Sequence, residues 1–151
     1  MAAAISAAGL VCVRKRRLDE GAEPPAIGSG AVLLVDTTGE MMGFYGQATI
    51  VFVGKSLTSH GGQNMIEPCL CGKPTLVGPH TENFRPVMAD LLAAEALLQV
   101  SDAAMLESTI AALLADATAR ATLGMRAVAA VERRRGVIGR CADLILKNID
   151  E

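Results

Sequence analysis

Five short runs rich in aliphatic and β-branched residues recur along this chain, with segments of helical pattern between them. The runs are LVCVRK from residue 10, AVLLVD at 31–36, TIVFVG at 49–54, PTLVGP at 74–79 and ALLQVS at 96–101. Strands buried on both faces read as continuous apolar runs, and their alternation with helices is typical of a parallel sheet with crossover helices. The sequence therefore predicts an α/β fold.

The segments between and after these runs carry the helical patterns and the loops. We expect the end of a helix at 3–9, a loop at 18–30, a turn at 37–40, and helices at 41–48, 65–71 and 83–94. From residue 102 onward the pattern is wholly helical, and it predicts helices at 102–115, 117–134 and 137–148. Asp102 is expected to cap the first of these three helices, because its carboxylate can accept backbone N–H bonds.

Composition and charge exclude several classes of protein. Hydrophobic residues make up 51% of the 151 residues, so the chain can bury a core, and no apolar run is long enough to span a bilayer. The opening MAAAISAAGLVCV has no preceding basic region and is followed by RKRR, which argues against a secretion signal. A net charge of −2 predicts no nucleic-acid partner. The four cysteines lack the spacing of paired zinc knuckles.

Three polar clusters follow predicted strands, where ligands bind in open α/β sheets. They are DTTGEM at 36–41, GKSLTSHGGQN at 54–64 and GPHTENF at 78–84. All three are expected at the same edge of the sheet, where they can converge on one crevice.

The second cluster has the clearest local physics. Asn64 is a good N-cap for a helix that starts at Met65, and Glu67 stands where a capping box needs a glutamate. Gly61 and Gly62 allow a sharp turn and a close approach of backbone to a ligand, and the helix N-terminus suits a phosphate. The alternative is that these residues form only a turn and a helix cap.

The two histidines, His60 and His80, both lie in these clusters. An imidazole there can act as a base, a metal ligand or a donor to a ribose or phosphate, and it can equally be a hydrogen-bonded loop side chain. Ser56 with His60 is a weaker alternative, as a nucleophile and its base. The Gly-Lys-Ser at 54–56 lacks the upstream glycine of a Walker A loop.

Taken together, residues 39–84 resemble the nucleotide-binding half of 3-deoxy-D-manno-octulosonic acid (Kdo) transferases. The matches to that family's motifs keep their order and spacing, at Gly39, Glu40, Tyr45, Phe52 to Gly54, Ser56, Leu57, Gly61, Gly62, Asn64, Glu67, Pro68, Gly72 to Pro74, Gly78 to His80, Asn83 and Phe84. Two residues depart from the family pattern: Lys55 stands in place of a glycine and Gln63 in place of a histidine.

The resemblance implies the C-terminal, Rossmann-like half of a GT-B glycosyltransferase, with an all-helical C-terminal portion. Residues 1–151 would then be a single partial donor-binding domain, and the acceptor-binding N-terminal domain with its general base would be absent. The expected reaction is transfer of Kdo from CMP-Kdo to a lipid A precursor in lipopolysaccharide biosynthesis, without metal or cofactor. The full-length enzyme would associate peripherally with the cytoplasmic face of the inner membrane of a Gram-negative bacterium. The fragment alone is expected to be inactive.

The resemblance also implies roles for individual residues in binding CMP-Kdo or CMP. Asn64 and Glu67 would meet the cytidine ribose or groups beside it. The backbone of Gly61, Gly62 and Gln63 would face the phosphate. Phosphate or sugar contacts are expected from Ser56, His80 and Asn83, and contacts to the base edge from Gly39, Glu40 and Met41. These groups would stabilise the CMP leaving group as its charge develops.

Two further hypotheses remain open at this point. The chain is alternatively a GT-B domain that uses a UDP- or GDP-sugar. It is also interpretable as a vestigial, non-catalytic sugar-nucleotide-binding domain, an alternative that the departures at Lys55 and Gln63 favour.

Overall fold

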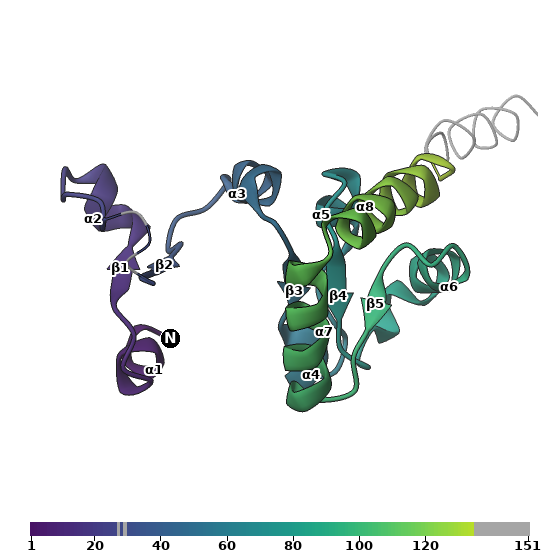
Figure 1. Ribbon diagram of the computed structural model, residues 1–151, viewed down its shortest axis with the longest axis horizontal. Helices are drawn as coiled ribbons and strands as arrows, with labels where there is room; N and C mark the ends of the chain where they lie inside the picture. Colours follow the sequence, from purple (N-terminus) through teal and green to yellow (C-terminus); the bar gives the residue numbers. More distant parts are fainter. Residues whose placement is uncertain (27, 29, 135–151) are drawn as a thin grey trace, which may run out of the picture. The chain divides into compact units, whose positions relative to one another are not determined.

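The computed structural model describes residues 1–26, 28 and 30–134, and these form two compact units that divide between Met41 and Met42. Each unit contains its own parallel sheet, one of two strands and one of three. The predicted α/β class with parallel sheets is confirmed (Figure 1).

The first unit is a small α/β assembly. It contains α1 (Ala2–Ala7), β1 (Cys12–Arg14), α2 (Lys15–Asp19) and β2 (Val32–Leu34). The two strands are parallel, with Cys12 opposite Val32. Asp36, just after β2, accepts hydrogen bonds from the Arg14 side chain at 2.7 Å and from the Arg16 backbone at 3.1 Å. That carboxylate joins the end of β2 to the start of α2, and the backbone bond to Arg16 is the main cause that holds its pKa below the usual value.

Two expectations for this unit need correction. The run at 31–36 was expected to be a buried strand, but the residues of β2 are half-buried or exposed. The reason is that β2 pairs with β1 alone in a two-stranded sheet. The helix α2, which was not predicted, reaches Asp19, so the loop expected at 18–30 begins two residues later.

The second unit follows an alternating order of strands and helices. Its described elements are α3 (Met41–Gln47), β3 (Val51–Val53), α4 (Lys55–Thr58), α5 (Ile66–Leu70), β4 (Thr75–Val77), the 3₁₀ helix η1 (Glu82–Phe84), α6 (Arg85–Ala93), β5 (Leu98–Gln99), α7 (Ala103–Ala115) and α8 (Ala117–Glu132). The strands lie in the order β3-β4-β5 and all run parallel.

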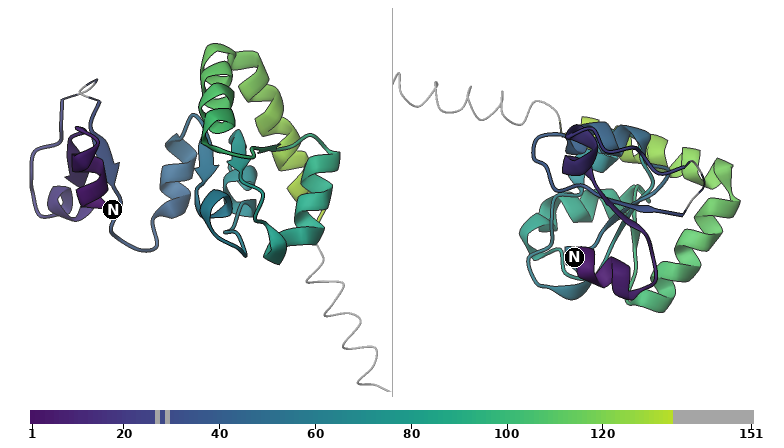
Figure 2. Two further views of the ribbon diagram at one scale, coloured as in Figure 1. Left: turned by 90° about the horizontal axis from the view of Figure 1, so that it is seen from below. Right: turned by 90° about the vertical axis from the view of Figure 1, so that its left-hand side faces the viewer.

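Both faces of this three-stranded sheet are covered by helices. Successive side chains of a strand point to opposite faces, so Leu76 and Val77 of β4 enter different clusters. Val77 packs with residues of α5, α6 and α8, whereas Leu76 packs with Leu113 of α7 and Leu123 of α8. Figure 1 shows α7 in front of β3, and Figure 2 shows α7 and α8 meeting at an angle. Burial on both faces explains why these strands read as continuous apolar runs.

The sequence predicted most elements of this unit within a few residues of their ends. The helices at 41–48, 65–71 and 83–94 and the strands at 49–54, 74–79 and 96–101 are confirmed, each somewhat shorter than expected. Asp102 caps α7 as predicted, because its carboxylate accepts the Met105 N–H at 2.8 Å. The short helix α4 was missed. The predicted helix at 137–148 lies outside the described residues. None of the helices in the described ranges has the length and apolarity to cross a bilayer.

A glycine contact brings α8 unusually close to the end of α5. A Cβ at Gly124 would lie 2.1 Å from the carbonyl oxygen of Gly72, which is shorter than any real contact. Gly72 itself has φ +65°, a left-handed conformation that ends the helix. Gly124 is therefore required in the middle of a helix because a backbone carbonyl occupies the space of its side chain.

We predict that Gly124→Ala lowers the free energy of unfolding by about 1–3 kcal/mol, because the added methyl group forces α5 and α8 apart. The matched control is Gly43→Ala in α3, where a Cβ would meet nothing within 4 Å. That variant should be neutral or more stable by up to about 1 kcal/mol, since alanine is the better helix former. Urea unfolding of both variants measures the difference. Equal effects would contradict the close contact.

Candidate functional site

The site is built on the carboxyl ends of β3 and β4, which are adjacent in the sheet. The chain after β3 forms α4 and the loop to α5, and the chain after β4 continues through Gly78 to η1. The expectation that polar clusters converge at one sheet edge is thus confirmed for the second and third clusters. The first cluster, 36–41, follows β2, which belongs to the other sheet.

Ser56 joins the two chain segments at this edge. Its side chain is completely buried; its hydroxyl donates to the Val53 carbonyl and accepts the Gly78 N–H at 2.7 Å. Its own backbone carbonyl accepts the His80 N–H at 2.9 Å. Two of these hydrogen bonds, from Gly78 and His80, hold the segment after β4 against the segment after β3, and the bond to Val53 fixes the hydroxyl between them.

Gly78 allows this close packing. A Cβ at that position would lie 2.4 Å from both the Leu57 Cα and the Ser56 carbonyl oxygen. Any other residue at 78 would push the backbones of the two segments apart. The pair Ser56 and Gly78 thus fixes the spacing of the loops that follow.

The role of Ser56 differs from the expectation. Ser56 was expected to contact donor phosphate or sugar, but its buried hydroxyl already bonds to Val53 and Gly78. Its hydroxyl is engaged with those backbone groups and not with His60, which argues against the nucleophile pair. Ser56 positions the loops instead.

The Gly61-Gly62 pair has positive φ angles of +90° and +67°. A Cβ at Gly62 would lie 2.7 Å from the His80 carbonyl oxygen, and one at Gly61 would lie 2.9 Å from the Asn83 amide nitrogen. The absence of side chains therefore lets the loop after α4 lie directly against the loop after β4. The glycine pair, expected to allow close approach to a ligand, allows close approach of the two loops. Its contact with a ligand stays a prediction.

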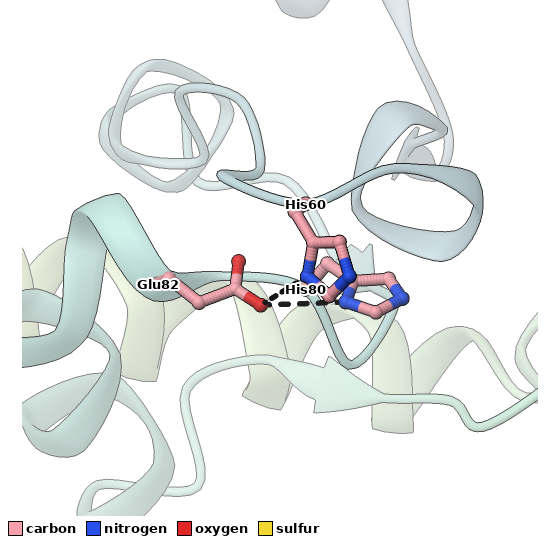
Figure 3. Close-up of side chains that lie close together, drawn as sticks. All are labelled: His60, His80 and Glu82. Atoms are coloured by element: carbon pink, nitrogen blue, oxygen red, sulfur yellow. Dashed lines mark hydrogen bonds and ion pairs between the residues drawn. The ribbon is translucent and has the colours of Figure 1, made fainter.

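Glu82 organises the polar centre of the two loops (Figure 3). One carboxylate oxygen lies 3.1 Å from the Nδ1 of His60 and 3.3 Å from the Nδ1 of His80, and the other accepts the Gly61 N–H at 2.7 Å. The two imidazole rings meet edge to face, with centroids 4.4 Å apart. Hydrogen bonds from its own backbone N–H, from Gly61 and from His60 lower the pKa of Glu82 to about 2. The carboxylate is thus ionised throughout the neutral range.

Asn64 and Glu67 lie side by side at the start of α5. The Asn64 side chain accepts the Ile66 N–H at 2.9 Å and donates to a Glu67 carboxylate oxygen at 3.0 Å. The prediction that Asn64 is the N-cap was off by one residue: Met65 is the N-cap and makes no side-chain cap bond, while Asn64 accepts the first helical N–H from the position before it. Glu67 bonds to the asparagine side chain, where a capping box would use the backbone. Burial, and after it the charge of Glu67, raises the pKa of Tyr45.

The remaining expected site residues belong partly to the second unit and partly to the first. Gln63 is exposed, as is Lys55. Gly39, Glu40 and Met41 belong to the first unit. There the Glu40 carboxylate accepts from the Thr37 hydroxyl and pairs with Lys15 at 3.1 Å, and these contacts lower its pKa. The part of these three residues in a donor site stays a prediction.

Glu82 is the residue that sequence reasoning missed. It stands between two residues that match family motifs, His80 and Asn83, and of its partners only His80 is close in the sequence. Its partners His60 and Gly61 are 22 and 21 residues away in the sequence. The one available signal was that both histidines were expected at one sheet edge together with this acidic residue.

Chemically, this edge combines hydrogen-bond donors with fixed negative charge. Imidazole and amide groups can donate to phosphate or sugar oxygens, and the Glu67 carboxylate can accept from a pair of hydroxyl groups. A parallel α/β unit with such loops beyond its strand ends has the architecture of a nucleotide- or sugar-nucleotide-binding domain.

Comparison with known proteins shows which enzymes this chain resembles. The chain is 39% identical over 144 residues to the 3-deoxy-D-manno-octulosonic acid transferase of Bordetella pertussis, and 37% identical over 115 residues to that of Haemophilus influenzae. These matches cover 95% and 76% of the chain. The chain is thus homologous to Kdo transferases, and the resemblance predicted from sequence is confirmed. No protein-family model matches the chain.

A solved structure supports the same assignment. The C-terminal CMP-Kdo binding domain of WaaA from Acinetobacter baumannii superposes with a TM-score of 0.73 at 28% identity, over 84% of this chain and 64% of that one. The chain spans 33% and 27% of the length of the two transferases. The similarity therefore concerns one part of a longer enzyme.

We predict that Ser56→Ala lowers the free energy of unfolding by about 1–3 kcal/mol, because it leaves the buried Gly78 N–H without its acceptor. Ser108→Ala on the exposed face of α7 is the matched control, since its hydroxyl bonds only to the Met105 carbonyl of the same helix. Chemical unfolding of both variants provides the comparison. A loss no larger than that of the control would show that Ser56 does not hold the loops.

Proposed function

We propose that this chain is part of the donor-binding domain of a Kdo transferase and that it binds CMP-Kdo. The observation that carries the proposal is the polar edge formed by the loops after β3 and β4. It lies in a chain similar in fold and sequence to a CMP-Kdo binding domain. Ligands of open α/β sheets bind beyond this end of the strands.

Glu67 and Asn64 are assigned to the ribose of the cytidine. Their mutual hydrogen bond of 3.0 Å leaves the second carboxylate oxygen of Glu67 available for a hydroxyl group. Glu67 is half-buried, so a bond to it is partly shielded from water. Asn64 holds the carboxylate in place, which lowers the entropy lost when the ribose binds.

The phosphate and the sugar are assigned to the loops around the glycine pair. The backbone of Gly61, Gly62 and Gln63 and the side chains of His80 and Asn83 would contact them. Gly39, Glu40 and Met41 of the first unit are proposed to contact the base. The contribution of these groups to catalysis would be to stabilise the negative charge that develops on CMP as it leaves.

The rest of the reaction belongs to the longer enzyme. We propose that its acceptor is a lipid A precursor and that a separate acceptor-binding domain supplies the general base. By its resemblance the transfer inverts the anomeric carbon and uses no metal. The enzyme would act in lipopolysaccharide biosynthesis at the cytoplasmic face of the inner membrane, and residues 1–151 alone would bind donor without transferring it.

We predict that CMP and CMP-Kdo bind to the chain. Glu67→Ala should weaken the affinity for each ligand by about 10- to 100-fold, because it removes one or two hydrogen bonds to a charged group. Isothermal titration calorimetry measures the affinity. Glu107→Ala on the exposed surface of α7 is the matched control and should bind like the parent chain. A well-folded chain that shows no binding of either ligand would contradict the proposal.

The same titration separates the alternatives. Competition by UMP or GMP more strongly than by CMP would indicate a domain for a UDP- or GDP-sugar. The departures at Lys55 and Gln63, both exposed, favour the second alternative, a vestigial domain. The double substitution Lys55→Gly and Gln63→His tests the vestigial alternative. If the parent chain does not bind CMP and the substituted chain does, the parent chain has lost its site.

A further inference from the structure

The His60, His80 and Glu82 side chains form a three-residue cluster that the proposed function does not use as a unit. Each contributes one nitrogen or oxygen atom, and these atoms all lie within 4.8 Å of one another. Two imidazole nitrogens and a carboxylate oxygen are the donor set of many zinc sites. We propose that this cluster binds a divalent transition-metal ion of the zinc type. The inference does not depend on the proposed function.

The distances within the cluster fit ligands around one ion. Zinc lies about 2.0–2.2 Å from nitrogen and oxygen ligands, so two ligands of a tetrahedral site are separated by roughly 3.3 Å. The Glu82 oxygen lies 3.1 Å and 3.3 Å from the Nδ1 atoms of His60 and His80. The ligand atoms of the two histidines lie within 4.8 Å of each other, and rotation of the exposed His60 side chain would bring its nitrogen to the same distance from an ion as the other two ligands.

The carboxylate is also held by a second partner. The Gly61 N–H bonds to the other Glu82 oxygen at 2.7 Å, which leaves the first oxygen facing the histidines. Partners of this kind orient metal ligands and raise affinity for the ion. Figure 3 shows the carboxylate group of Glu82 directed at both rings.

The site would be open on one side. The side chain of His60 is 86% exposed, whereas those of His80 and Glu82 are 29% and 35% exposed. Water can therefore complete a four-coordinate shell from the His60 side. Because His60 lies in the loop after α4, and His80 and Glu82 follow β4, a bound ion would clamp the two loops together. The site is assigned this structural effect and no step in sugar transfer.

The test uses cobalt(II) as a spectroscopic substitute for zinc. The chain, freed of metal with EDTA and then desalted, should bind one Co²⁺ with visible d–d absorption and without strong thiolate charge transfer in the near ultraviolet. Zn²⁺ should displace the cobalt. His60→Ala and Glu82→Gln should each weaken binding by about tenfold or more. Loss of a residue that only hydrogen-bonds to a metal ligand already lowers metal affinity by that factor. Glu107→Gln is the matched control and should bind normally.

A second measurement follows stability. Zn²⁺ should raise the thermal midpoint of the parent chain and of Glu107→Gln but not of His60→Ala, because only a chain that binds the ion is stabilised by it. His60 is exposed, so its loss should leave the fold intact. Absence of cobalt binding, equal affinity in His60→Ala, or a spectrum dominated by charge transfer from any of the four cysteine thiolates would overturn the proposal.

Discussion

The buried hydrogen bonds of Ser56 determine the arrangement of the second unit's functional edge. The loops after two adjacent parallel strands begin at the same edge of the sheet, but the distance between these loops depends on the residues that lie between them. Here the Ser56 hydroxyl bonds to Val53 and Gly78, and its carbonyl bonds to His80. Gly78 has no space for a side chain against this residue. The positions of the histidines, Glu82 and the glycine pair all follow from that junction.

Above the junction, the two loops contact each other through backbone as well as side chains. Gly62 lies against the His80 carbonyl, and Gly61 donates to Glu82. An edge held this firmly presents its imidazole, amide and carboxylate groups in fixed positions, which lowers the cost of binding a polar ligand. This is the physical basis on which we connect similarity to a CMP-Kdo binding domain with a donor site in this chain.

The sequence predicted what depends on local pattern and failed where distant residues decide. Strands β3 and β4 and the Asp102 cap could be predicted, because apolar runs and capping residues act over a few positions. The half-buried state of β2 could not, since it depends on which strands pair. Ser56 was expected at a ligand and proved buried. Glu82 was missed because two of its partners, His60 and Gly61, are about twenty residues away.

The central claim is that the loops after β3 and β4 form the site for the donor nucleotide. Amide chemical shifts of the ¹⁵N-labelled chain during a titration with CMP test this claim most directly. The account predicts saturable shifts concentrated at residues 60–67 and 78–83, with little change in α7 and α8. Saturable shifts concentrated elsewhere in the described part of the chain, with those loops unaffected, would contradict it.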